Sequence, residues 1–303
     1  MVIFLLLALN ILLFFISLSI GRFNVPLIEV VKLMLGKVFH LIEPIDSTYD
    51  TIVFSIRLPR ILAAMLIGAA LSQSGAAYQG LFNNPLVDPY ILGLSAGAGF
   101  GAAIAILMNG NYLIIELFAF GFSLLAVFLT STISRSSKSV VTMVLSGFIV
   151  SSLFTSLISF LKYYADPYTK LPSIVYWLMG TLSQVSAKEI AFIAPIMLVS
   201  MIALYLLRWK LNILSLGTEE ALSLGENPAK LRFIIVVIST VLTSLSVSIS
   251  GIIGWVGLVI PHLGRMLVGP DYRKLLPTSI LLGSSYLLIM DNLSRSISAS
   301  EIP

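Results

Sequence analysis

Long apolar runs alternate with short polar segments along almost the whole chain. A helix that crosses the hydrocarbon core of a bilayer needs about 20 predominantly apolar residues, and most of these runs approach that length. Read by their length and their polar flanks, they predict nine membrane-spanning helices, over residues 1–20, 59–81, 90–108, 112–134, 139–162, 190–208, 231–250, 252–268 and 275–297.

Two stretches of this pattern are not expected to span. Residues 21–60 contain prolines, several charges and one short apolar run, which predicts an outer loop with one helix at the membrane surface. The next span is expected to begin at Pro59, since proline is tolerated in the first helical turn. Residues 171–181 are apolar but too short to cross, which favours a re-entrant or interfacial helix.

The composition agrees with this pattern and excludes several classes of protein. Hydrophobic residues make up 58% of the 303 residues and charged residues 11%, against roughly 25% charged residues in soluble domains. A soluble enzyme and a disordered chain are therefore excluded, and a dispersed net charge of +4 is no footprint of a nucleic-acid-binding protein. The expected fold is an all-α polytopic membrane protein in one domain, residues 1–303.

Basic residues in the loops do not decide the orientation of the predicted spans. Cytoplasmic loops normally carry an excess of lysine and arginine. With the N-terminus inside, however, nine basic residues fall on each side of the membrane. Five of the outer nine lie in residues 21–60. Either that loop has a special use or the topology is inverted.

The sequence lacks the motifs of the common enzyme and metal sites. It has no G-x-x-x-x-G-K-[ST] for nucleotide phosphates and no cysteine. Residues 97–102 fit G-x-G-x-x-A, but they lie inside an apolar span, where small residues serve close helix packing. The two histidines, His40 and His262, are far apart in the sequence, and no metal site is expected.

The polar segment 211–232, between two predicted spans, is expected to fold into short helices. Thr218 is predicted to cap one of them. Glu219 and Glu220 would then lie in its first turn, where the helix dipole favours acidic side chains. Gly225 is a natural stop for this helix.

Two interpretations of this segment remain open. The pair Asn227-Pro228 offers a second helix start, and the whole segment is first of all a solvated connector. Alternatively it is a docking knob for a soluble partner, because a connector need not build capped helices. Its contact surface would then be a small apolar face formed by Ala221, Leu222 and Leu224.

Arginines at the ends of two spans also allow two interpretations. Arg57 and Arg60 lie at the mouth of the second span, and Arg295 follows Asp291 by one helical turn in the last span. Interfacial arginines commonly extend to lipid headgroups, and an i, i+4 pair with Asp291 is first a structural bridge. If all three arginines face one side, they form a basic rim suited to acidic side chains of a partner.

The segment 83–89, Asn-Asn-Pro-Leu-Val-Asp-Pro, breaks the chain between two spans with two prolines. It is either an ordinary loop or a constriction in a pathway. The second interpretation follows because irregular backbone at membrane depth survives only beside protein or water.

Five ordered stretches resemble the transmembrane subunits of the vitamin B12, haem and ferric-siderophore importers, the type II ATP-binding-cassette importers. The resemblance covers nearly the whole chain, and five blocks in the same order make it specific. The stretches are RLPRILAAMLIGAALSQSGAAYQGLFNNPLVDPYILGLSAGAGFG (57–101), YWLMGTLS (176–183), LNILSLGTEEALSLG (211–225), GWVGLVIPHLGRMLVGPDYRKLLP (254–277) and DNLSRSISASEIP (291–303).

This resemblance implies a transporter subunit in the cell membrane, and no enzyme. In the family, two ten-span permeases form a homodimer around a central pathway. Two copies of a separate ATPase, which use ATP and Mg²⁺, bind one side, and an extracytoplasmic substrate-binding protein binds the other. The chain itself is expected to bind no cofactor, and its contacts outside this assembly are membrane lipid and no nucleic acid.

The resemblance also implies roles for single residues. The family's ATPase-docking loop matches Glu219, Glu220, Ala221, Leu224 and Gly225. Family arginines that pair with glutamates of the binding protein match Arg57, Arg60 and Arg295. The cytoplasmic gate matches Asn84 and Leu86, and a second gate element falls loosely on Ser139, Val140 and Val141.

Family members continue beyond the position of Pro303 into a tenth span, so nine of the usual ten spans are expected here. The implied cargo is a metal-chelate-type substrate, a corrinoid, haem or ferric siderophore, with oxyanions carried in some branches. Rival classes are a self-contained secondary transporter or channel, for which Glu116 is the main intramembrane candidate, and a membrane-embedded enzyme.

Overall fold

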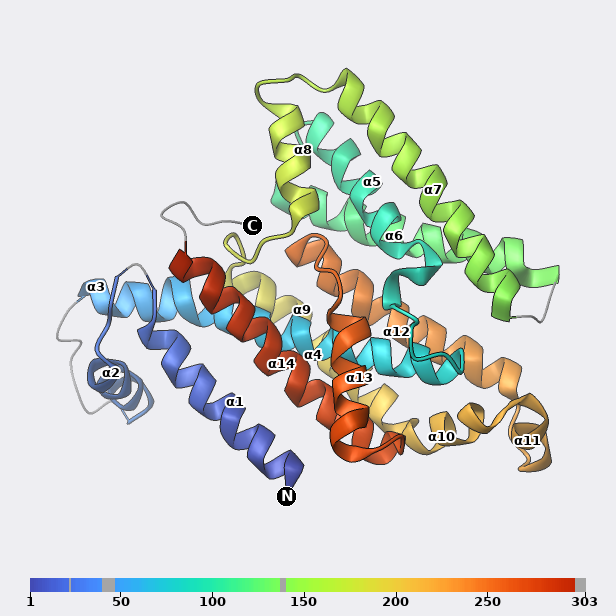
Figure 1. Cartoon of the computed structure of the whole chain (residues 1–303). Coiled ribbons are helices and arrows are strands. Elements are labelled where there is room, and N and C mark those ends of the chain that lie inside the picture. The colour runs from blue at the N-terminus through green and yellow to red at the C-terminus, as the bar shows by residue number, and fades with distance from the viewer. Residues whose placement is uncertain (22, 40–46, 137–139, 298–303) are drawn as a thin grey trace.

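The computed structural model describes residues 1–21, 23–39, 47–136 and 140–297, and every regular element in these ranges is a helix (Figure 1). In chain order the elements are α1 (Val2–Ser19), α2 (Leu27–Phe39), α3 (Ser47–Asp50), the π-helical turn η1 (Thr51–Arg57), α4 (Leu58–Leu81), the 3₁₀ turn η2 (Pro89–Leu92), α5 (Leu94–Leu107), α6 (Tyr112–Ile133), the 3₁₀ turn η3 (Ser134–Ser136), α7 (Val140–Tyr164), α8 (Lys170–Met179), α9 (Ala187–Leu206), α10 (Arg208–Leu216), α11 (Thr218–Ser223), α12 (Pro228–Ser250), α13 (Val256–Val268) and α14 (Tyr272–Ile297).

All nine predicted spans coincide with helices in the described ranges, namely α1, α4, α5, α6, α7, α9, α12, α13 and α14. Six described segments are long and apolar enough to cross a membrane. They are Val2–Ser19, Thr48–Leu81, Tyr112–Ile133, Val140–Tyr164, Ala187–Leu206 and Pro228–Ser250. The shorter α5 and α13, of 14 and 13 residues, depend on adjoining irregular backbone to complete a crossing. The short helix expected near residues 171–181 is α8.

The second spanning helix begins earlier than the sequence predicts. It does not start at Pro59, because helical backbone continues from Ser47 through η1 directly into α4. Proline removes a backbone donor, and its ring presses on the carbonyl group four residues earlier. The wider π-helical turn directly before Pro59 accommodates both effects. The predicted outer loop 21–60 therefore includes α2, α3 and the first turns of this helix.

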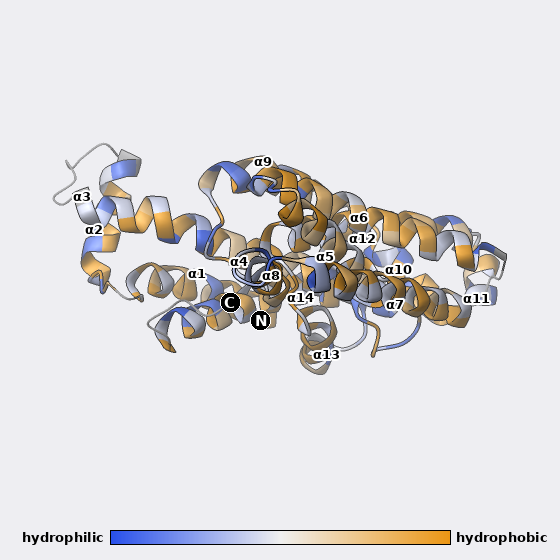
Figure 2. Ribbon diagram, turned by 90° about the horizontal axis from the view of Figure 1, so that it is seen from above, coloured by the Kyte–Doolittle hydropathy of each residue, from blue (hydrophilic) through white to orange (hydrophobic). Residues whose placement is uncertain are grey.

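Helix α4 forms the centre of the bundle. It packs against α14, α12, α13 and α9, and its side chains from Gly68 to Leu81 are buried without interruption. The outer faces of the surrounding helices are largely hydrophobic (Figure 2). On α7, for example, Phe148, Leu153 and Phe160 are exposed, as expected for side chains that face lipid.

Small residues let the backbones of these helices approach one another closely. A Cβ atom at Gly68 would lie 2.2 Å from the carbonyl oxygen of Gly283 in α14, and one at Gly75 would lie 1.8 Å from that of Gly257 in α13. At Gly97 and Gly101 of α5, a Cβ atom would lie within 2.5 Å of a backbone oxygen of α6. The G-x-G-x-x-A match therefore serves helix packing, as the sequence predicted.

We predict that Gly75→Ala destabilises the protein by about 1–3 kcal/mol, because the added methyl group must displace the backbone of α13. Thermal unfolding of the purified protein in detergent measures the effect. Gly121→Ala is the matched control: a Cβ atom there has no heavy atom within 4 Å, so alanine gains only helix propensity. Equal melting temperatures for the two variants would contradict close contact at Gly75.

Candidate functional site

Helices α10 and α11 form an elbow at the end of the bundle where α4 ends and α12 begins (Figure 1). The far end of the molecule carries α2 and α3 (Figure 2). Leu211 and Leu214 of α10 are buried, and α10 packs against α4 and α14. The elbow is therefore fixed to the central helices through α10, while α11 projects from the bundle.

Both ends of α11 are shaped by glycine. Gly217 (φ 128°) precedes the helix and provides no side-chain cap, so the prediction that Thr218 is the cap is wrong. The Thr218 hydroxyl instead accepts a hydrogen bond from Arg232 at 3.0 Å. At the other end Gly225 (φ 78°) donates to the carbonyl of Leu222, and the next amide donates to Ala221. This left-handed termination confirms Gly225 as the stop.

The tip of the elbow presents charge and apolar surface together. Glu219 and Glu220 are exposed in the first turn of α11, and Leu222 and Leu224 are each 58% exposed. Ala221 is instead fully buried against the bundle. The outward apolar face therefore consists of two leucines, whereas the sequence predicted three residues. The pair Asn227-Pro228 begins the long helix α12, where the Asn227 side chain accepts from the amide of Lys230.

The three arginines lie at the opposite end of the bundle, and all three are buried, with exposed fractions of 5–7%. Arg60 Nε lies 2.7 Å from Asp291 Oδ1, and Arg295 Nε lies 3.1 Å from Asp291 Oδ2. One carboxylate thus joins α4 and α14 through two guanidinium groups. The i, i+4 bridge expected between Asp291 and Arg295 is confirmed, and Arg60 is its additional member.

Arg57 has a different set of partners. Its Nη1 atom donates to the carbonyl oxygens of Leu18 at 2.6 Å and Ser19 at 3.0 Å, and Nη2 donates to that of Phe23. Leu18 and Ser19 are the last residues of α1, whose final carbonyl groups have no partner within the helix. A positive charge at a helix C-terminus is also favoured by the helix dipole.

The turn between α4 and η2 holds the predicted gate residues. Asn83 adopts a left-handed backbone conformation (φ 49°), and the Asn84 side chain accepts a hydrogen bond from the amide of Leu86 at 2.9 Å. Leu86 is 76% exposed, whereas Val87 is buried. In this turn Val87 is a buried anchor, and Leu86 beside it projects outward.

The second predicted gate element is only partly described. Ser139 lies outside the described residues, Val140 begins α7, and Val141 is 64% exposed. A pocket of about 510 Å³ brings Val140 together with Leu222 of the elbow and Phe82 at the end of α4. The elbow, the end of α4 and the start of α7 therefore share one cavity.

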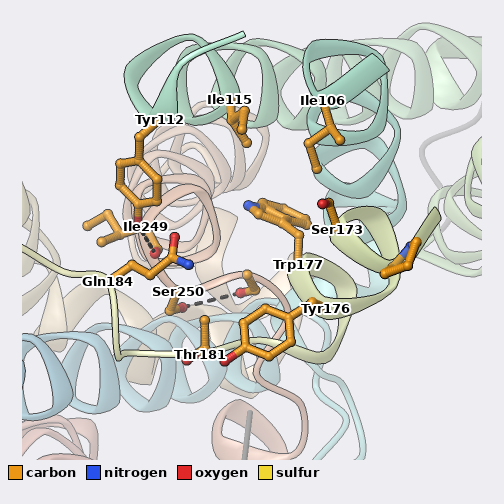
Figure 3. Close-up of a pocket in the computed structure, with 12 residues that line it drawn as sticks. Ile106, Tyr112, Ile115, Ser173, Tyr176, Trp177, Thr181, Gln184, Ile249 and Ser250 are labelled. Carbon is orange, nitrogen blue, oxygen red and sulfur yellow. Dashed lines mark hydrogen bonds between the residues drawn. The ribbon is translucent and has the colours of Figure 1, made fainter. Parts of the chain in front are cut away.

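A second cavity, of about 440 Å³, lies among α5, α6, α8 and the end of α12 (Figure 3). The Trp177 ring projects into it from α8, and the Tyr112 hydroxyl donates to the carbonyl of Ile249 at 3.1 Å on its opposite wall. Gln184 directs its amide group toward the same space. The lining is aromatic and weakly polar, which suits a surface with low affinity for a passing solute.

Glu116, the candidate for a self-contained transporter, is buried in α6 with an exposed fraction of 6%. Within the described residues its Oε1 atom has no hydrogen-bond partner. The nearest acid that interacts with it is Glu189, which repels it. Two acids do not make a metal centre, and the described part of the chain holds no group of three histidine, aspartate or glutamate side chains around one point.

Sequence reasoning assigned no role to Asn212, Asp271 or Gln79, although each makes several contacts. Asn212 Nδ2 donates to Asp271 Oδ1 at 2.7 Å. Hydrogen bonds from Arg273 and from Asn212 hold the pKa of the Asp271 carboxyl far below its ordinary value. Gln79 is buried inside an apolar helix, and a glutamine in such a position is the one local signal that was available.

Comparison with known proteins agrees with this geometry. The FecCD transport family model matches residues 7–303. The molybdate import system permease protein MolB of Haemophilus influenzae is 42% identical over 291 residues, covering 95% of this chain and 86% of the relative. The cobalamin import system permease protein BtuC of Halobacterium salinarum is 36% identical over 262 residues, covering 86% of this chain and 70% of the relative.

A solved structure points to the same family. It is described as an inward-facing conformation of a metal-chelate type ABC transporter, and it aligns with a TM-score of 0.90 at 39% identity, covering 99% of this chain and 92% of that one. The family model, the relatives and this structure together confirm the resemblance seen in the sequence. The chain therefore belongs to the FecCD transport family and is a permease subunit of an ATP-binding-cassette importer, a multi-pass protein of the cell membrane and a transporter subunit rather than an enzyme.

Proposed function

We propose that two copies of this chain form the pathway of an importer for a metal-chelate-type substrate. The elbow would receive a separate ATPase on the cytoplasmic side, and that partner would bind and hydrolyse ATP with Mg²⁺. The arginine end would receive an extracytoplasmic protein that delivers the substrate. In this arrangement the chain binds no cofactor of its own, and its work is conformational.

The elbow is the observation that carries this proposal. A short helix with two exposed carboxylates and two exposed leucines projects from the bundle, and α10 fastens it to α4 and α14. Such a mixed surface suits a protein partner, because apolar contact supplies affinity and charge supplies orientation. A free-standing transporter has no need of it.

In this proposal, alternating access arises from coupling between the elbow and the predicted gate. ATP binding in the partner would displace α11, and the rigid helices would carry the displacement to Leu86 and to the start of α7. Coupling of this kind is a free energy shared between two sites, so a change at the gate must also alter nucleotide affinity. The shared pocket of about 510 Å³ leaves room for the elbow to move against α7 and α4.

Corrinoid, haem and ferric siderophore are the proposed substrate classes, and an oxyanion is the second candidate. The oxyanion is favoured by one relative, whose name states molybdate import at 42% identity. The uncharged, aromatic lining of the cavity around Trp177 gives no strong selection, so we propose that the choice falls to the binding protein. Isolating that protein with the importer and identifying its bound ligand by mass spectrometry distinguishes the two candidates.

We predict that the double substitution Glu219→Lys, Glu220→Lys weakens ATPase association at least roughly tenfold, about 1.4 kcal/mol. Two exposed acids would become two bases at the centre of the proposed contact, where like charges repel the partner. The dissociation constant, measured by surface plasmon resonance with the permease in nanodiscs, gives the result. Glu29→Lys in α2, at the opposite end, is the matched control. Unchanged affinity in the double variant would refute elbow docking.

If the binding protein docks at the arginine end, it must reach three arginine side chains that are buried in the permease. Arg57, Arg60 and Arg295 already contact groups within the chain, so a partner's glutamates would join existing networks. A guanidinium group has five N–H donors, and each of these side chains can hold an internal acceptor and an external carboxylate together. We therefore propose that the network positions the charges and that acidic residues of the binding protein complete it.

We predict that Arg57→Gln weakens capture of the binding protein, and more strongly at low salt, where charge attraction is least screened. Affinity measured across a salt series, beside the melting temperature of each variant, separates docking from stability. Lys188→Gln, an exposed charge at the start of α9, is the control. A lower melting temperature with unchanged affinity at every salt concentration would assign Arg57 to stability alone.

A further inference from the structure

The start of α14 is completed by a side chain of the elbow. Asn212 of α10 accepts a hydrogen bond from the amide of Tyr272, the first residue of α14, at 2.8 Å. The Asn212 side chain also donates, through Nδ2, to Asp271 Oδ1 at 2.7 Å. The first amides of a helix have no partner within it, so Asn212 caps α14 from a distance of 60 residues in the sequence. Any displacement of α10 must move this terminus or break both bonds.

Tyr272 carries this connection into the bundle. Its side chain is buried and lies against the backbone of Gly80, where an added Cβ atom would be 2.7 Å from the ring. The Tyr272 hydroxyl interacts electrostatically with the guanidinium group of Arg265 in α13. Arg265 in turn donates to Gln79 Oε1. Three helices, α14, α13 and α4, thus meet through two consecutive polar contacts.

Gln79 connects this chain of contacts to the predicted gate. Its amide nitrogen lies 3.2 Å from the carbonyl oxygen of Val87 and 3.3 Å from that of Leu258. Val87 is the buried anchor of the turn that exposes Leu86. The bond to Val87 is buried and the bond to Leu258 is partly buried, and a buried donor left without a partner costs about 1–3 kcal/mol. Breaking one of these contacts therefore costs more free energy than moving the contacting residues together.

We propose that Asn212, Tyr272, Arg265 and Gln79 form a relay that transmits movement of the elbow to the turn bearing Leu86. The four are positioning residues, since none needs to touch the substrate. This inference rests on the proposed function, because it assumes that the partner ATPase moves the elbow. It adds a physical route between the two sites, which is a claim that requires evidence of coupling.

One shorter route competes with the relay. The Asn83 side chain lies 3.5 Å from the carbonyl oxygen of Leu214 in α10, at the limit of hydrogen-bond distance. Asn83 is also exposed, so water can replace this contact at little cost. The two bonds at Asn212 are shorter, at 2.7 and 2.8 Å against 3.5 Å for this contact. One of them also satisfies the first backbone amide of α14.

The test measures movement of the turn directly. The chain has no cysteine, so Leu86→Cys gives one spin-label site in each permease of the assembled importer. Electron-paramagnetic-resonance distance measurement between the two labels is made in nanodiscs, without nucleotide and with ATP, Mg²⁺ and vanadate. The labelled parent is expected to change its interspin distance on addition of nucleotide. This readout requires no knowledge of the transported substrate.

Two relay variants and two controls are compared in this labelled background. Asn212→Ala and Gln79→Ala interrupt the relay at its two ends. Lys210→Ala removes the ion pair with Glu226 in the same elbow without touching the relay. Asn83→Gly removes the competing contact and keeps the left-handed turn, which glycine adopts freely.

The relay predicts that both interrupted variants still bind the ATPase and hydrolyse ATP, while the nucleotide-driven distance change falls at least threefold. Lys210→Ala and Asn83→Gly should keep the full change. A full change in Asn212→Ala or Gln79→Ala, whichever assembles, overturns the relay. Loss of the change in Asn83→Gly alone assigns transmission to the direct contact. A parent importer with no ATPase bound, or no change with nucleotide, refutes the proposed function instead.

Discussion

Inside a bilayer every backbone polar group needs a partner from the protein, and this constraint governs the centre of the molecule. Irregular backbone lies in the turn after α4 and in the residues between α12 and α13. Side chains satisfy carbonyl groups in both places: Gln79 donates to Val87 at 3.2 Å, and the Tyr90 hydroxyl donates to Ile253 at 2.7 Å. Each of these two irregular segments is therefore held by a side chain from a neighbouring part of the chain.

Close backbone contact complements this polar bonding. At Gly68 and Gly75 the neighbouring helix replaces the side chain itself, so α4 has little freedom to shift relative to α13 and α14. Movements imposed on one end are then carried along stiff helices to the other end. Open space lies toward the periphery, in the pocket beside α7 and in the aromatic cavity beside α8.

The fold was largely predictable because hydropathy acts locally. Apolar runs such as residues 112–134 and 231–250 are enough by themselves to predict a span, and Gly225 is enough to predict a helix end. The start of α4 was not predictable in this way, since η1 contains a charge whose partners are the carbonyl groups of α1. Arg57 reads as an interfacial residue in sequence and becomes a buried cap only in three dimensions.

The candidate site was predictable only where a motif is continuous. The acidic residues of α11 were found, although Ala221 proved to face inward. Asn212, Arg265 and Gln79 were not found, because their partners lie 60, 186 and 178 positions away. No local pattern encodes such pairs. The one available hint was the amide of Gln79 inside a predicted span.

The bond between Arg57 and the end of α1 bears on how the chain enters the membrane. Helix α1 emerges from the ribosome before α4, and its last carbonyl groups find their partner in a guanidinium group 39 residues after Leu18. The helix against which α1 mainly packs, α14, is synthesised later still. The surroundings of α1 are therefore completed in two steps during synthesis, first by Arg57 and then by α14.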